Sequence, residues 1–219
     1  MTARNKPYDL IIFDWDGTLM DSESKIVNCF RKAVADININ YPGDEAVRNI
    51  IGLGLKEALD VLIPNQTEST RQQVVDRYRE HFLHLDDTEM PLFRGVEEGL
   101  KRLQSVNYSL AIATGKARVG LEKVLQHTGL AEHFIISRCA DETMSKPHPR
   151  MVLDILAETG VPADRAIVVG DTTYDVEMAQ RADTDALAVC YGVHHREKLL
   201  AQQPIACVEN FEAVLEWFL

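Results

Sequence analysis

The chain is short of basic residues. It has 23 lysines and arginines against 34 aspartates and glutamates, which gives a formal net charge of −11. Proteins that bind nucleic acid neutralise its phosphates with basic patches. The charge balance therefore argues against a nucleic-acid partner. It also predicts that an anionic substrate must be attracted by a local group of cations, since the average field of the protein repels it.

Long apolar runs and closely spaced cysteines are also missing. No apolar run approaches the ~20 residues that a helix needs to cross a bilayer, and the segment Met1 to Pro7 lacks the apolar stretch of a signal peptide. These features predict a cytoplasmic protein with no membrane partner. The four cysteines form no CxxC pair, which predicts reduced thiols and no thiolate metal site: Cys29, Cys139, Cys190 and Cys207.

Short apolar segments alternate with helical patterns over most of the 219 residues. The predicted strands are Asp9 to Phe13, Ser109 to Ala113, Phe134 to Ser137, Ala166 to Val169 and Asp185 to Val189. Apolar residues three and four apart predict helices at Val96 to Leu103, Val119 to Thr128, Arg150 to Glu158 and Asp175 to Ala182. The strands lack strict alternation, so both faces of the sheet should be covered. This pattern predicts an α/β fold with a doubly wound parallel (Rossmann-like) sheet.

The alternation breaks once, between the first and second predicted strands. From about Asp21 to Asp87 the apolar spacing is helical throughout, and Pro- or Gly-containing segments near positions 41–44 and 63–65 divide it. The block is long enough to pack on itself. We therefore expect an α/β core domain made of residues 1–20 and 88–219, and an inserted all-helical cap domain at 21–87.

The first predicted strand ends in Asp14-Trp15-Asp16-Gly17-Thr18. Residues two apart on a strand point to the same side, so Asp14 and Asp16 can face one ligand. Gly17 allows the sharp turn that follows. Two close carboxylates repel each other unless a proton or cation lies between them. The alternative is an Asp-rich turn that merely ends the strand.

Polar residues also follow the later strands. They are Thr114, Gly115 and Lys116 after the second strand, Lys146 in the Pro-containing loop after the third, and Asp171 and Asp175 after the fourth. Ligands of open parallel sheets bind at the carboxyl ends of the strands. Together with Asp14 and Asp16, these positions supply four carboxylates, the hydroxyl of Thr114 and the ammonium group of Lys146 at one edge. A hard cation with oxygen ligands, Mg²⁺, would relieve the carboxylates and allow a phosphate to approach.

With these four motifs in this order, the chain resembles the haloacid dehalogenase-like (HAD) hydrolase superfamily, in its Mg²⁺-dependent phosphatase branch. Within it, the overall layout is most similar to phosphoglycolate phosphatase-like enzymes. The resemblance spans nearly the whole chain, and it implies that residues 21–87 correspond to the helical cap of that superfamily. It also implies the reaction: hydrolysis of a small phosphorylated metabolite through an aspartyl-phosphate.

The resemblance further implies a role for each matching residue. Asp14 would be the nucleophile, and Asp16 the general acid and then the base for water. Thr114 would hydrogen-bond the phosphoryl oxygens with Gly115 beside it, and Lys146 would hold both Asp14 and the phosphate. Magnesium would be bound by Asp14, Asp171 and the backbone carbonyl of Asp16, with Asp175 supporting the site directly or through water.

Other charged residues give weaker indications. Arg48 and Lys56 flank Gly52-Leu53-Gly54 in the insertion and could contact an anionic part of the substrate, although solvated helix surface is the more common role of such charges. Lys116 could contact phosphate, with solvent exposure slightly favoured. We expect the pair His194-His195 to lie in a surface loop.

Four questions stay open. A phosphomutase of the same superfamily would share every core residue. A phospho-accepting receiver domain also combines acids, a Thr and a Lys at a sheet edge, but it lacks an insertion after the first strand. The substrate is not determined: phosphoglycolate, a sugar phosphate, a nucleotide and pyrophosphate all remain open, as does the choice between a monomer and a homodimer.

Overall fold

The computed structural model describes residues 8–219. The segment Met1 to Pro7, in which the sequence predicts no signal peptide, lies outside the described residues. No helix among the described residues is both long and apolar enough to cross a membrane.

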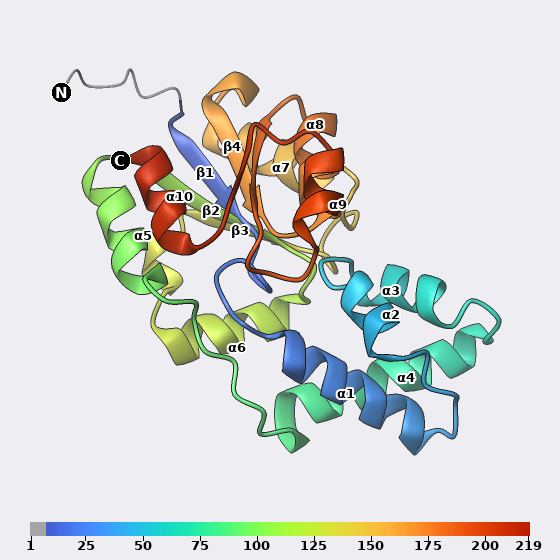
Figure 1. Ribbon diagram of the computed structural model, residues 1–219. Helices are drawn as coiled ribbons and strands as arrows, with labels where there is room; N and C mark the ends of the chain where they lie inside the picture. Colours follow the sequence, from blue (N-terminus) through green and yellow to red (C-terminus); the bar gives the residue numbers. More distant parts are fainter. Residues whose placement is uncertain (1–7) are drawn as a thin grey trace.

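A six-stranded parallel sheet forms the centre of the molecule (Figure 1), in the order β3-β2-β1-β4-β5-β6. The strands are β1 (Leu10–Phe13), β2 (Ser109–Thr114), β3 (Ile136–Cys139), β4 (Ala166–Gly170), β5 (Asp185–Val189) and β6 (Ala206–Val208). The chain winds outward from β1 in both directions, so β1 and β4 lie at the topological switch point, where such sheets bind ligands. The predicted doubly wound α/β fold is confirmed, and β6 is an additional strand that the sequence analysis did not predict.

Helices cover both faces of this sheet. On one face α5 (Val96–Ser105), α6 (Arg118–Thr128) and α10 (Phe211–Phe218) pack in the apolar cluster that contains Ile11 and Phe13. On the other, α7 (Arg150–Thr159), α8 (Thr173–Arg181) and α9 (Arg196–Ala201) pack in the cluster that contains Leu10 and Ile12. Successive residues of β1 thus point to opposite faces and are all buried, which explains the missing polar alternation.

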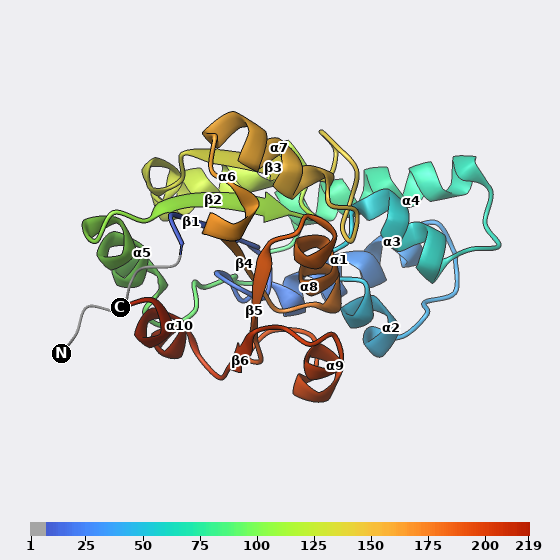
Figure 2. The same cartoon turned by 90° about the horizontal axis from the view of Figure 1, so that it is seen from above.

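The chain between β1 and α5 is helical. It forms α1 (Glu23–Asp36), α2 (Asp44–Asn49), α3 (Leu55–Leu62), α4 (Glu68–Glu80) and the π-helix η1 (His81–Leu85). Of these, α1 to α4 share an apolar cluster of their own, which includes Phe30, Val47, Leu59 and Val74. Figures 1 and 2 show α1–α4 gathered beside one end of the sheet. The division into core and cap stays a prediction, and we use "cap" below for residues 21–87.

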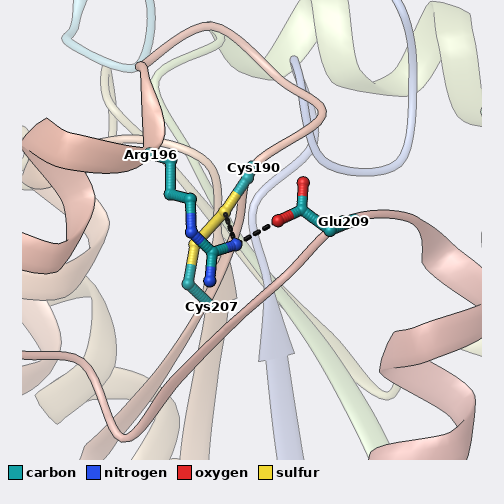
Figure 3. The surroundings of a disulfide bond; sticks show 4 residues. All are labelled: Cys190, Arg196, Cys207 and Glu209. Carbon is teal, nitrogen blue, oxygen red and sulfur yellow. Dashed lines mark hydrogen bonds and ion pairs between the residues drawn. A yellow bond between two sulfur atoms is a disulfide. The ribbon is translucent and has the colours of Figure 1, made fainter.

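The expectation of reduced cysteines is wrong for one pair. Cys190 and Cys207 form a disulfide, which lies next to Arg196 and Glu209 in Figure 3. Cys190 follows β5 directly and its N–H donates to Val208 O (2.8 Å) on the neighbouring strand β6. Strand pairing therefore brings together two thiols that are 17 residues apart in sequence. Cys29 and Cys139 are free and buried.

Candidate active site

Asp14 and Asp16 lie where β1 leaves the sheet. The N–H of Asp14 still donates to Val169 O (2.9 Å) and continues the pairing with β4. Gly17 then turns the chain with φ +82°, a conformation that side chains disfavour. Trp15 points into the core, fully buried against Phe134, which leaves the two carboxylates on the other side.

Lys146 connects two of the predicted carboxylates. Its Nζ lies 2.7 Å from Asp14 Oδ1 and 2.7 Å from Asp175 Oδ1, and all three side chains are essentially inaccessible. Burial disfavours the ammonium form, but the charges of Asp14 and Asp175 outweigh this effect and raise the pKa of Lys146. Lys146 is therefore a permanent cation at the centre of the site.

Asp171 and Asp175 are fixed by hydrogen bonds from neighbouring loops. Asp171 accepts from Thr18 Oγ1 (2.9 Å) and from the N–H of Val193 (2.7 Å). Asp175 forms a capping box with Thr172 at the start of α8, where Thr172 Oγ1 donates to Asp175 Oδ2 (2.6 Å). Neither aspartate can turn away without losing these partners.

The carboxylates of Asp14, Asp171 and Asp175 form a cluster whose ligand atoms all lie within 4.8 Å of one another. Neither side-chain oxygen of Asp14 accepts a hydrogen bond, although Oδ1 is ion-paired with Lys146. Burial is the main cause of a strongly raised pKa for Asp14; Lys146 opposes the shift, and Asp175 and Asp171 add to it. Burial, and then the charge of Asp175, raise the pKa of Asp171 to about 7.

These observations test whether a cation suits the cluster. Three buried acids lie beside one lysine, and the raised pKa values of Asp14 and Asp171 show that the cluster lacks positive charge. The donor set consists of carboxylate oxygens, the ligand type that Mg²⁺ prefers. The residues fit a hard divalent cation.

Asp16 takes no part in this cluster through its side chain. Its carboxylate accepts from Lys116 Nζ (2.8 and 3.0 Å) and from Ser22 Oγ (2.5 Å). The expectation that Lys116 is exposed is wrong: its side chain is 6% exposed, because it is inserted between Asp16 and the ring of Phe82. Only tertiary structure brings Phe82 of η1 to this place.

Thr114 is the last residue of β2 and Gly115 follows it directly. Both lie close to the cap. Thr114 is fully buried, and its Oγ1 accepts from the N–H of Lys116 (3.2 Å). A Cβ on Gly115 would lie 2.5 Å from Gly52 O, and the N–H of Gly54 donates to Ser145 Oγ (2.7 Å). The segment Gly52 to Gly54 therefore lies directly over the catalytic edge of the sheet.

The two cap residues that were weaker candidates for substrate contact, Lys56 and Arg48, lie in different places. Lys56 is exposed and lines a cavity that reaches Asp14 and Asp16. Arg48 instead pairs with Glu23 (2.5 Å) and lines a different hollow beside α9. The structure thus groups Lys56, but not Arg48, with the strand-end residues.

The prediction that His194-His195 forms a surface loop is wrong for His194. His194 is 4% exposed, and its Nδ1 accepts from the N–H of Thr173 (3.1 Å). Burial lowers the pKa of His194. The imidazole of His194 thus helps to hold the loop whose Val193 N–H donates to Asp171. No local pattern in the sequence indicates this role.

The chain was compared with known proteins. The family model described as "Haloacid dehalogenase-like hydrolase" matches residues 11–189. "Probable phosphatase IndB" of Dickeya dadantii is 35% identical over 94% of this chain and 91% of its own length, and a "Phosphoglycolate phosphatase" of Nitrosococcus oceani is 27% identical over 94% of each. A crystal structure titled as a predicted phosphatase from Clostridium acetobutylicum aligns with TM-score 0.86 and 25% identity over 96% of this chain and 97% of that one.

The resemblance inferred from the motifs is thereby confirmed, and the receiver-domain alternative is wrong. The relatives are named phosphatases, as expected for a phosphoric monoester hydrolase. The sheet order, the acidic cluster and the family match agree: this chain belongs to the haloacid dehalogenase-like hydrolase family.

Proposed function

We propose that this chain is a Mg²⁺-dependent phosphatase that hydrolyses a small phosphomonoester through an aspartyl-phosphate on Asp14. One observation carries the proposal: Asp14, Asp171 and Asp175 converge from two strand ends beside the buried Lys146. The names of the relatives, which include phosphatases and phosphoglycolate phosphatases, support the same reaction class.

Asp14 and Asp171 would hold the metal, with the backbone carbonyl of Asp16, and Asp175 would support it directly or through water. The bound ion would supply positive charge against the phosphoryl oxygens and would keep the three acids ionised together. Lys146 would add a second positive charge beside Asp14 and Asp175. The negative charge of the three acids is then balanced locally by the ion and Lys146, although the chain as a whole is negative.

In the first step an oxygen of Asp14 attacks phosphorus, and the bond from phosphorus to the ester oxygen breaks. Asp16 gives its proton to the departing alkoxide, which leaves as an alcohol. Thr114 donates a hydrogen bond to a phosphoryl oxygen, and Lys146 holds Asp14 in line. Splitting the hydrolysis into two displacements lowers each barrier.

In the second step water attacks phosphorus and the bond to Asp14 breaks. Asp16, now a carboxylate, accepts the proton of that water, so each turnover returns both aspartates to their initial state. Proton transfer of this kind contributes ~10²–10⁴-fold to the rate. The hydrogen bonds from Lys116 and Ser22 keep Asp16 in one orientation for both steps.

The test is release of inorganic phosphate from a panel of phosphorylated metabolites. We expect release with Mg²⁺ and none in excess chelator. Asp14→Asn should lose turnover while it keeps the wild-type circular dichroism spectrum. Isomerisation of a sugar phosphate with no free phosphate would favour the phosphomutase instead, and full activity in Asp14→Asn would refute the nucleophile. The cytoplasmic location and the choice between monomer and homodimer stay predictions.

A further inference from the structure

A cavity of about 400 Å³ extends from Asp14 and Asp16 into the cap. Its walls come from α1 to α4, η1 and the loop between α2 and α3 on the cap side, and from the segments that follow β2 and β3 on the other side. Most of the buried lining is apolar: Phe30, Ile50, Ile51, Leu59 and Phe82, with the half-buried Val75 and Tyr78. The rings of Tyr78 and Phe82 stack with centroids 5.7 Å apart and form a continuous aromatic wall.

The cations along this cavity are engaged or peripheral. Lys116 is bound to Asp16, and Arg71 is bound to Asp60 and to Pro64 O (2.7 Å), although the buried Nε of Arg71 has no hydrogen-bond partner among the described residues. Lys56 and Arg79 are exposed, and the exposed acids Glu57 and Glu68 also line the cavity. Among the described residues that line the cavity, none is a buried cation left without an acidic partner. A substrate carboxylate held inside it would be desolvated with no counter-ion, which is costly.

We propose that the leaving group of the natural substrate is an apolar, ring-sized organic group, and that it occupies this cavity; the inference rests on the phosphatase function proposed above. The phosphate lies at the strand ends, and the remaining part of the molecule replaces water against Tyr78, Phe82 and Val75. A cavity of this volume suits a small-molecule group rather than a two-carbon acid.

Tyr78 supplies the one polar group of the aromatic wall. Burial, followed by the charges of Cys29 and Asp16, raises its pKa well above the ordinary value, so the phenol is neutral and can donate a hydrogen bond. Its hydroxyl can therefore bind a single oxygen or nitrogen on an otherwise apolar group. A polyhydroxylated sugar would leave most of its hydroxyls without partners.

The test compares esters whose leaving alcohols have similar acidity, so that only binding differs. Wild-type enzyme with Mg²⁺ is assayed on ethyl phosphate, 2-phenylethyl phosphate, phosphoglycolate and glucose 6-phosphate. We expect kcat/KM for 2-phenylethyl phosphate to exceed that for ethyl phosphate at least about tenfold, since the ring is removed from water. The kcat/KM for 2-phenylethyl phosphate should exceed the values for phosphoglycolate and glucose 6-phosphate by a still larger factor.

Two results would overturn the inference in different ways. Turnover of phosphoglycolate or glucose 6-phosphate at least as efficient as that of 2-phenylethyl phosphate would refute the apolar leaving group and leave the phosphatase function intact. Release of phosphate from none of the four esters would refute the function, and the inference with it.

Two matched variants test where the ring of the leaving group binds. Val75→Thr places a hydroxyl in the wall at almost constant volume, and should lower kcat/KM for 2-phenylethyl phosphate about three- to tenfold with little change for ethyl phosphate. Val61→Thr makes the same substitution at an exposed site on α3 outside the cavity, and should change neither. Equal losses on both esters in Val75→Thr would contradict the proposed position of the ring.

Discussion

The Nζ of Lys116 lies 2.8 and 3.0 Å from the two carboxylate oxygens of Asp16. Both side chains are buried, and the same Nζ lies 4.7 Å from the centroid of the Phe82 ring in the cap. The pair joins the ends of β1 and β2 beneath η1. Lys116 and Ser22 thereby hold Asp16 apart from the acidic cluster.

The Asp16–Lys116 pair predicts that the effect of substituting either residue on the rate depends on the leaving group of the ester. Asp16→Asn should slow hydrolysis of an alkyl phosphate by about 10²–10⁴-fold. It should still release a stoichiometric burst of nitrophenol from p-nitrophenyl phosphate, whose leaving group needs no proton. Lys116→Met should change the rates in the same direction but less, because Ser22 still holds Asp16. Stopped-flow measurement of both esters checks this.

The control for the lysine is Lys101→Met, which removes an exposed pair with Glu97. It should leave both rates unchanged. Equal slowing of the burst and of alkyl ester turnover in Lys116→Met would mean that Lys116 acts on phosphate rather than through Asp16.

Magnesium should stabilise the fold through the acidic cluster. An ion that binds only the folded state at about 100 times its Kd adds about 2.7 kcal/mol to the free energy of unfolding. Thermal unfolding should therefore shift upward with Mg²⁺ in the wild type and stay constant in Asp171→Asn. Asp183→Asn, an equal charge change at an exposed turn, should keep the shift. A full shift in Asp171→Asn would remove this residue from the metal site.

Gly17 is required by space as well as by its backbone conformation. A Cβ there would lie 2.2 Å from Asp171 Oδ2, so Gly17→Ala should displace Asp171 and abolish the Mg²⁺-dependent activity. Gly129→Ala is the matched control, since Gly129 also has positive φ (+71°) but no atom within 4 Å of the added methyl group. It should cost about 1 kcal/mol of stability and leave the metal affinity unchanged. Isothermal titration with Mg²⁺ separates the two effects.

Asp86, where the cap returns to the core, should contribute to acid unfolding. Burial alone would raise its pKa, but Lys32 and the hydroxyl and N–H of Thr88 outweigh burial and lower it from 3.8 to about 2. Because the folded pKa is depressed, this stabilisation is present above pH ~4 and is lost as the pH falls through about 2.

Asp86→Asn should therefore lower the free energy of unfolding by about 1 kcal/mol at pH 7 and by almost nothing at pH 2, measured with urea. Its neighbour Asp87 is exposed, so Asp87→Asn should have no such pH-dependent effect. A constant difference between Asp86→Asn and the wild type across this range would mean that the carboxylate charge of Asp86 is not what stabilises the fold.

Much of the fold follows from short-range patterns. The strands β1, β2, β4 and β5 were located within about one residue, since continuous apolar runs have no other stable environment than a sheet covered on both faces. Gly129 and Gly160 end α6 and α7 with positive φ, the conformation in which a glycine commonly ends a helix. The three-residue β6 was missed because so short an edge strand carries no periodic signal.

The candidate site can be divided in the same way, into features that follow from the local sequence and features that depend on tertiary contacts. The sequence by itself determined the family, the parallel sheet, and which residues stand at the ends of the strands, because residue type and position relative to a strand are properties of the local chain. Only the tertiary structure decided that Lys116 is buried on Asp16, that Cys190 meets Cys207, and that an aromatic wall faces the acids. Each of these contacts joins segments that are distant in sequence, and their partners are selected by packing, which no local pattern encodes.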